Sequence, residues 1–134
     1  MLLPNDALIA VADGEKLVLF KNTGNEASPQ LIMLQSPQLG IENKGSGGRH
    51  HSSAANPDDS QQEEDGFAAG IADMLNKQVL AGHVKHLVVI AAPRTLGELR
   101  KRYHKSLSSK LIGEIAKDLT GHSASEIEAA IAVA

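Results

Sequence analysis

Residues 7–20 read ALIAVADGEKLVLF, two apolar runs separated by Asp13-Gly14. An Asp-Gly pair between apolar runs is a strong short-range hairpin pattern, because both residues tolerate the backbone conformation of a tight turn. We therefore expect antiparallel strands over Ala7–Ala12 and Lys16–Phe20.

A third strand and a helix are expected next along the chain. Gln30–Gln35 is a short apolar run that completes a three-stranded antiparallel meander. Further on, Ser60 and Glu63 match a capping box, the side-chain pattern that opens many helices. Apolar residues at helical spacing between Phe67 and Val79 then predict a helix that ends near Gly82.

The next segment combines a buried strand with a basic helix. Val84–Ala92 contains a continuous apolar run, which is typical of a strand covered on both faces of a sheet. Pro93 ends this run, and Thr95 with Glu98 forms a second capping box. We expect a basic helix from there to about His104.

The last segment is ambiguous over Lys110–Leu119. Its apolar residues fit a helical stripe, whereas Gly113 and the Thr120-Gly121 turn also suit a short strand. Ser123 with Glu126 caps a final helix. The predicted fold is thus one α/β domain over residues 1–134 with a mixed sheet: the meander followed by α-β-α-(β)-α, with a long loop at about 36–60.

Composition restricts the function classes. The 134 residues contain no cysteine, which excludes disulfides and thiolate metal sites. Aromatic residues make up 2%, which argues against extensive base stacking, and a net charge of -3 argues against a generally basic nucleic-acid binder. The N-terminus lacks the features of a signal peptide and no apolar run reaches the length of a membrane span, so we expect a cytoplasmic protein without membrane insertion.

The charges are nevertheless unevenly distributed. The segment Asp58–Asp65 is acidic, whereas the segment 94–110 holds one acid, Glu98, among six cations: Arg94, Arg100, Lys101, Arg102, Lys105 and Lys110. Such a cluster can follow an RNA backbone, although a solvated basic face is the simpler alternative. Arg94 and Thr95 also stand where a buried strand gives way to a helix, a position that favours anions; plain strand termination and capping explain the same residues.

Residues 43–53 read NKGSGGRHHSS, a composition that no packed core needs. Glycines let the backbone approach a ligand closely, and successive backbone N–H groups can cradle a phosphate. The candidate ligand-binding residues of this loop are Lys44, Gly47, Gly48, Arg49, His50 and His51. The segment lacks the P-loop pattern, and a flexible connector remains the alternative.

The order of elements and several motifs resemble the bacterial family of host attachment proteins. The resemblance rests on the Val-Ala-Asp-Gly-Glu-Lys centre of the first hairpin, on Gly45–Ser53, on Ala91–Arg100 and on Lys117–Gly121. It implies a protein partner in attachment to host cells.

That family is similar in turn to the middle domain of archaeal and eukaryotic peptide-chain release factors, which has an RNase H-like fold. The resemblance implies an RNase H-like mixed sheet and a loop that reaches RNA or a ribosomal site. In release factors a Gly-Gly-Gln loop promotes peptidyl-tRNA hydrolysis. Here Gly47 and Gly48 match, but Arg49 replaces the glutamine, so hydrolysis does not carry over.

The leading hypothesis is a non-catalytic RNA- or ribosome-binding module without cofactor or metal. Asp13 could serve a metal-dependent hydrolase acting on RNA or peptidyl-tRNA, but an Asp-Gly turn explains it better. His83 and His86 fit the entrance of a strand better than a zinc site. An interaction or regulatory protein that affects host attachment is the other alternative.

Overall fold

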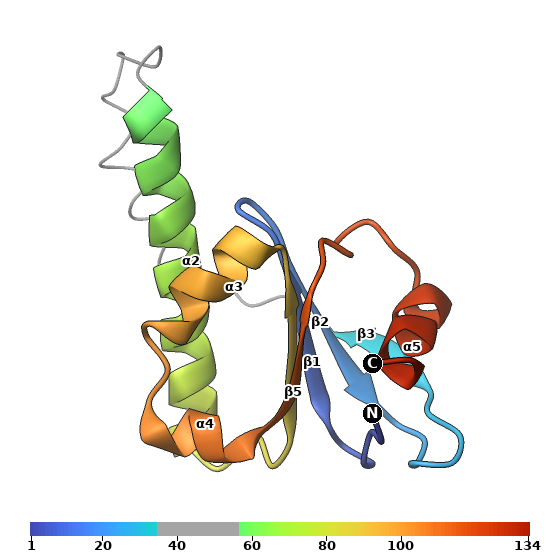
Figure 1. The fold of residues 1–134 in the computed structure, drawn as a ribbon. Helices are drawn as coiled ribbons and strands as arrows, with labels where there is room; N and C mark the ends of the chain where they lie inside the picture. The colour runs from blue at the N-terminus through green and yellow to red at the C-terminus, as the bar shows by residue number, and fades with distance from the viewer. Residues whose placement is uncertain (35–56) are drawn as a thin grey trace.

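The computed structural model describes residues 1–34 and 57–134 (Figure 1). Five strands and four helices lie in these residues. In chain order they are β1 (Leu8–Ala12), β2 (Leu17–Asn22), β3 (Leu31–Leu34), α2 (Pro57–Leu80), β4 (Leu87–Ala91), α3 (Pro93–Arg100), α4 (Lys105–Lys110), β5 (Leu111–Ala116) and α5 (Ala124–Ala132).

The strands form one mixed sheet in the order β3-β2-β1-β4-β5. The predicted meander is confirmed, because β2 pairs antiparallel with both β1 and β3. On the other side β4 pairs parallel with β1, and β5 parallel with β4. The carboxyl ends of β1, β4 and β5 therefore meet at one edge of the sheet. We call the connections that follow these ends, 13–16, 92–94 and 117–120, the carboxyl edge.

Helices cover both faces of the sheet, so the domain has three layers (Figure 1). Helices α2, α3 and α4 lie against one face and α5 against the other. All five residues of β4 are buried, as its continuous apolar run predicts. On α2 the predicted inward face is confirmed, since Ile71, Leu75 and Val79 are buried. Among the described helices, none combines the length and apolarity needed to cross a membrane.

The ambiguous segment is a strand over most of its length. Leu111–Ala116 pairs with β4, and one residue bulges out of the ladder between Leu111 and Gly113. A Cβ at Gly113 would meet the far end of the Met1 side chain, which would have to move aside. β5 is an edge strand, and a bulge at an edge discourages pairing with another chain.

Two of the three predicted capping boxes are wrong. α2 begins at Pro57 and α3 at Pro93, so Ser60 and Thr95 lie inside their helices. Proline suits a first helical position because its φ is already helical and its missing N–H would have no partner there. The third box is confirmed: the Ser123 hydroxyl accepts from the Glu126 N–H, and the Glu126 carboxylate accepts from the Ser123 N–H.

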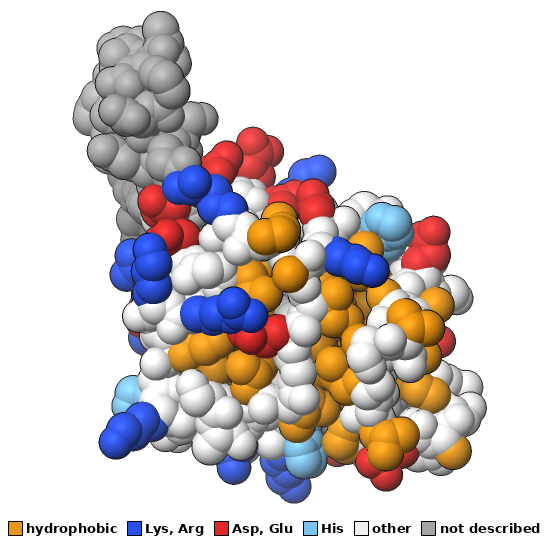
Figure 2. Space-filling view, in the orientation of Figure 1, with side chains coloured by type: hydrophobic (Ala, Val, Ile, Leu, Met, Phe, Trp, Pro, Cys, Tyr) orange, Lys and Arg blue, Asp and Glu red, His pale blue; other side chains and the backbone are white. Residues whose placement is uncertain are grey.

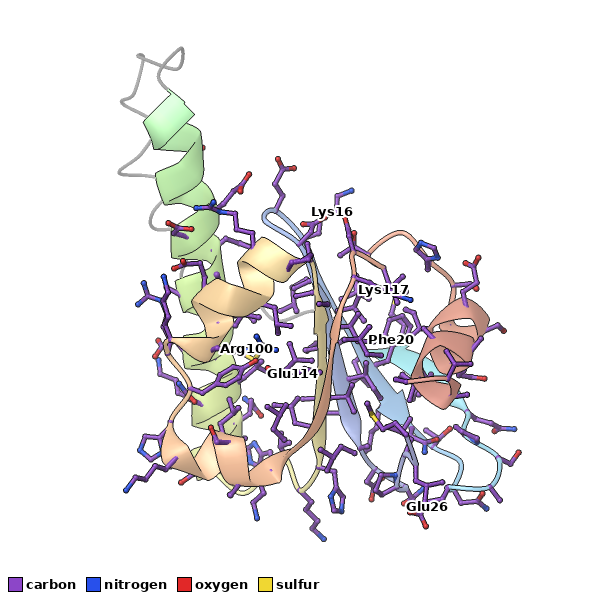
Figure 3. The ribbon with its side chains drawn as sticks, viewed as in Figure 1. Lys16, Phe20, Glu26, Arg100, Glu114 and Lys117 are labelled. Atoms are coloured by element: carbon purple, nitrogen blue, oxygen red, sulfur yellow. The ribbon has the colours of Figure 1, made fainter. Side chains whose placement is uncertain are left out.

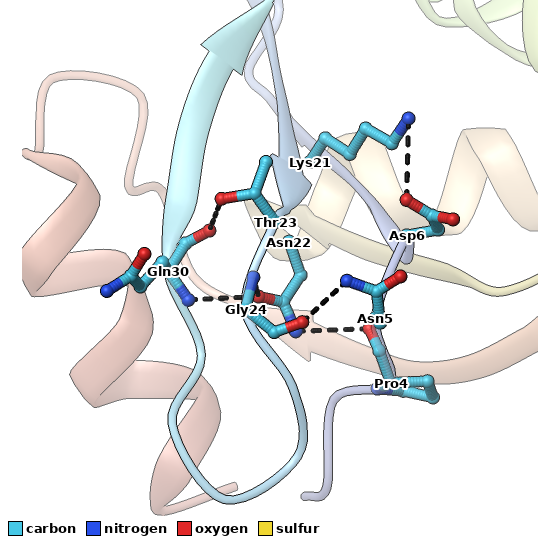
Figure 4. A network of polar contacts seen from close by, with 8 residues as sticks. All are labelled: Pro4, Asn5, Asp6, Lys21, Asn22, Thr23, Gly24 and Gln30. Carbon is cyan, nitrogen blue, oxygen red and sulfur yellow. Dashed lines mark hydrogen bonds and ion pairs between the residues drawn. The ribbon is translucent and has the colours of Figure 1, made fainter.

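One buried polar residue, Asn22, fastens the amino end of the chain to the meander (Figure 4). Its Nδ2 donates to the carbonyl oxygens of Leu3 at 2.9 Å and Pro4 at 3.1 Å. Its Oδ1 accepts from the N–H groups of Gly24 and Gln30, both at 2.9 Å. The amide thus uses all four of its hydrogen-bonding positions, as burial requires.

Candidate nucleic-acid interface

The loop candidates of the sequence, Lys44, Gly47, Gly48, Arg49, His50 and His51, lie outside the described residues. The residues on either side of the loop are described, up to Leu34 and again from Pro57. β3 runs parallel to β1, so the chain leaves Leu34 in the direction of the carboxyl edge. Asp65, whose carboxylate faces Arg94, lies eight positions after Pro57, which is about 12 Å along the helix. Both flanks therefore point to the end of the sheet where Arg94 lies.

Arg94 stands at the carboxyl edge, in the first turn of α3. Its Nη2 lies 3.7 Å from Asp65 Oδ1, and its side chain is 57% exposed. An ion pair this long and this exposed contributes little to the stability of the fold, and its two side chains separate readily. Thr95, by contrast, is buried, so its side chain does not face solvent.

The structure brings two further cations to this edge, Lys16 and Lys117 (Figure 3). Lys16 closes the turn between β1 and β2, Lys117 follows β5 directly, and both are exposed. No local sequence pattern groups them, because they lie 101 positions apart and meet only through the parallel pairing of β1, β4 and β5. In open α/β sheets this edge is where ligands bind.

Hydrogen bonds around Asp13 hold the carboxyl edge together. Asp13 Oδ1 accepts from the N–H groups of Glu15 at 2.7 Å and Lys16 at 2.6 Å, which confirms its turn role. The Thr120 hydroxyl lies 3.0 Å from Asp13 Oδ2 and 2.8 Å from Asp118 Oδ1, so the two carboxylates compete for its one hydrogen. Hydrogen bonds from Thr120 lower the pKa of Asp118, with smaller help from His122 and Lys16.

No group of three or more acidic, histidine or cysteine side chains within residues 1–34 and 57–134 is arranged to hold a metal ion. His83 precedes β4 and bonds instead to Gln78, with His83 Nδ1 3.0 Å from Gln78 Oε1.

The predicted basic helix is confirmed over α3, but it ends at Arg100 rather than near His104. A turn follows, and a second helix, α4, begins at Lys105. His104 caps α4, its Nδ1 accepting from the Ser106 N–H at 3.1 Å. Asn76 of α2 holds the turn between α3 and α4, because its Nδ2 donates to the Arg102 carbonyl and its Oδ1 accepts from the His104 N–H. The helix α3 starts at the carboxyl edge, and α4 leads into the opposite end of β5.

Two of the cations in this region are already paired. Arg100 Nε and Nη2 lie 3.0 and 2.9 Å from the same Glu114 oxygen (Figure 3), and Lys101 lies 2.8 Å from Glu98. Arg102 and Lys105 form no ion pair with the part of the chain that the structure describes. Acidic and basic side chains alternate on this side of the molecule (Figure 2). The predicted basic cluster is therefore a mixed surface.

Tyr103 lies beside the Arg100–Glu114 pair. Its hydroxyl is 3.4 Å from Glu114 Oε2. Burial raises the pKa of Tyr103 above its usual value, and the charge of Glu114 raises it further. The phenol is thus held neutral and serves as a donor to Glu114.

Comparison with known proteins gives one family. A search of curated proteins finds no match. The model of bacterial archaeo-eukaryotic release factor family 12 matches residues 6–131, which covers the sheet from before β1 and nearly all of α5. This agrees with the release-factor resemblance drawn from the motifs, whereas the match does not carry the host attachment name. The chain belongs to bacterial archaeo-eukaryotic release factor family 12.

Proposed function

We propose that this chain is a non-catalytic module of translation that binds RNA on the ribosome through the carboxyl edge of its sheet. The family description supports a role connected with release factors. We also propose that the sheet is RNase H-like. The order β3-β2-β1-β4-β5, with β2 antiparallel to its neighbours, supports this assignment.

One observation carries the proposal: Arg94, Lys16 and Lys117 gather at the edge toward which both flanks of the segment 35–56 point. The glycine-rich loop within that segment supplies Lys44, Gly47, Gly48, Arg49, His50 and His51 as further contacts in this proposal. Cations placed around a phosphate backbone bind it by releasing counterions, which requires no deep pocket.

The cations of α3 and α4 have different parts in this proposal. Arg100 and Lys101 are engaged by Glu114 and Glu98, so they contribute less charge to a passing phosphate. Arg102 and Lys105 extend the surface for an RNA that follows α3 away from the edge, while Thr95 offers its backbone N–H at the start of α3.

Within residues 1–34 and 57–134, no specific contact favours a hydrolase or a host attachment protein. Asp13 Oδ1 accepts two backbone hydrogen bonds within the turn, and its Oδ2 lies 3.0 Å from the Thr120 hydroxyl, which gives this residue a structural role beside any hydrolytic one. The description of the matching family names release factors and not attachment to host cells. This favours a role in translation over a role in attachment.

Filter binding to ribosomal RNA over a series of salt concentrations tests the proposal. Arg49→Ala and Arg94→Ala should each weaken binding and should reduce the salt slope by about 0.7–0.9, the contribution of one phosphate contact. Arg94→Lys keeps the charge and should retain most of the binding. Wild-type affinity in both alanine variants would exclude this mechanism.

A further inference from the structure

A pocket of about 280 Å³ lies at the opposite end of the sheet from the carboxyl edge. It opens between the second half of α2 and the start of β1, on the face that carries α2. Its floor is apolar and consists of Leu8, Leu19, Leu34, Met74 and Val84. This volume is just below the 300–1,000 Å³ of pockets that bind drug-sized ligands, so the pocket suits a smaller molecule.

The rim of this pocket carries a cation and an anion side by side. Lys21 Nζ lies 3.5 Å from Asp6 Oδ1, and the two side chains are 44% and 59% exposed (Figure 4). A tight charge-assisted bond is 2.7–2.9 Å long, so this pair is loose. Solvent screening makes such exposed pairs weak, and a ligand can separate them at small cost.

Asp6 is held in an unusual backbone conformation. Its φ of 69° is the one positive value among non-glycine residues in the described ranges. The Asp6 N–H donates to the Asn22 carbonyl at 2.8 Å, which ties this conformation to the buried Asn22 network. Residues held in sparsely populated regions of φ/ψ space often mark functional sites, and here the conformation fixes a carboxylate at the mouth of a pocket.

Gln78 and His83 form the other polar part of the lining. Since Gln78 Oε1 can only accept, His83 Nδ1 carries the hydrogen of their 3.0 Å bond. The lining thus combines both signs of charge with further hydrogen-bonding groups and apolar side chains.

We propose that this pocket binds a free α-amino acid with an aliphatic or thioether side chain. The ligand's ammonium group pairs with Asp6, its carboxylate pairs with Lys21, and its side chain packs on Leu8, Leu19 and Met74. A purely anionic ligand would meet the Asp6 carboxylate, and a purely cationic one would meet Lys21. A zwitterion satisfies both rim charges, and its apolar side chain displaces water from the floor.

This site is independent of the proposed RNA-binding edge. Asp6 precedes β1 and Val84 precedes β4, so both lie at the amino ends of these strands, whereas Arg94 and Lys117 follow the carboxyl ends. Loss of RNA binding and loss of amino-acid binding can therefore be separated by mutation.

Isothermal titration of the full chain with L-leucine tests the proposal. Three related probes separate the contacts: N-acetyl-L-leucine lacks the ammonium, L-leucinamide lacks the carboxylate, and glycine lacks the side chain. We expect L-leucine to bind at least tenfold more tightly than each of the three. Equal binding of N-acetyl-L-leucine and L-leucine, or no binding of L-leucine, would overturn the proposal.

Two variants assign the contacts to residues. Asp6→Asn keeps a residue that tolerates positive φ and removes the charge, and Lys21→Met removes the ammonium while keeping the stem. Each should weaken L-leucine binding at least tenfold, whereas Asp73→Asn, at an exposed pair with Lys77 on α2, should leave it unchanged. Unaltered binding in Asp6→Asn contradicts the assignment; should that variant unfold, the four probes on the wild-type chain still decide.

Discussion

The Thr120 hydroxyl lies 3.0 Å from Asp13 Oδ2, although 107 residues separate the two in sequence. The contact joins the β1–β2 turn to the connection after β5. Lys16 and Lys117 belong to these same two connections, so the contact joins the backbone segments that carry two exposed cations of the carboxyl edge.

Thr120→Val should therefore weaken the fold, because valine matches the shape of threonine but donates no hydrogen bond. We expect a loss of about 1–2 kcal/mol in the free energy of unfolding, measured by urea denaturation. Thr23→Val is the control, since the Thr23 hydroxyl bonds the Gln30 carbonyl at an exposed position. An equal effect of both substitutions would show that the contacts of the Thr120 hydroxyl with Asp13 and Asp118 have no special role.

Asn22→Leu should be among the most damaging substitutions in the meander. It leaves the Leu3 carbonyl without its partner in a buried bond, and the Gly24 and Gln30 N–H groups without theirs in partly buried bonds, while the Pro4 carbonyl keeps the Ala7 N–H. We expect a loss of roughly 3 kcal/mol or more, since each buried polar group left unpaired costs about 1–3 kcal/mol. Asn25→Ala removes one exposed bond, to the Ser28 N–H, and should cost less than about 1 kcal/mol. Similar denaturation midpoints for the two variants would refute this account of Asn22.

Tyr103 can be followed directly by absorbance, because the chain holds one tyrosine. Its raised pKa predicts a titration midpoint above the usual value of about 10 in the folded protein, and a return to about 10 in denaturant. With the folded pKa above the unfolded one, the neutral phenol stabilises the fold fully below about pH 10, and this contribution is lost as the pH rises through the folded pKa. The stability difference between wild type and Tyr103→Phe should change over that range. A folded-state midpoint at or below the unfolded one would contradict the burial of the phenol beside Glu114.

Asp6→Gly and Asp6→Ala should differ in stability although both remove the carboxylate. Glycine adopts φ near 69° without strain, whereas alanine pays about 1–2 kcal/mol for a left-handed conformation. The glycine variant should be the more stable of the two by about 1 kcal/mol in urea denaturation. Equal stability would mean that the chain at residue 6 relaxes to an ordinary conformation.

Local sequence patterns were sufficient for much of the fold. The Asp13-Gly14 turn with its two apolar runs, the buried run of β4 and the Ser123–Glu126 box all act between near neighbours, so the sequence predicted them correctly. The errors came from competition between local patterns. Pro57 and Pro93 start their helices ahead of the capping residues, and the Asn76 contacts hold a turn where charge alone suggested a continuous helix.

The site was less predictable because it depends on pairing between distant strands. Arg94 was found from its place between a strand and a helix, which is a local property. Lys16 and Lys117 join it only through the parallel alignment of β1, β4 and β5. Likewise, Glu114 pairs with Arg100 across elements, so the sequence could not show that a predicted RNA contact has an acidic partner.

Co-sedimentation with ribosomes tests the central claim most directly, using two double variants that each remove two exposed cations. Arg94→Ala/Lys117→Ala alters the carboxyl edge, and Lys85→Ala/Lys110→Ala alters the residues just before β4 and β5, at the opposite edge. The proposed function predicts that the wild-type chain and the second variant sediment with ribosomes, that added salt releases them, and that the first variant stays largely in the supernatant. Equal sedimentation of both variants, or none by the wild-type chain, would contradict binding through the carboxyl edge.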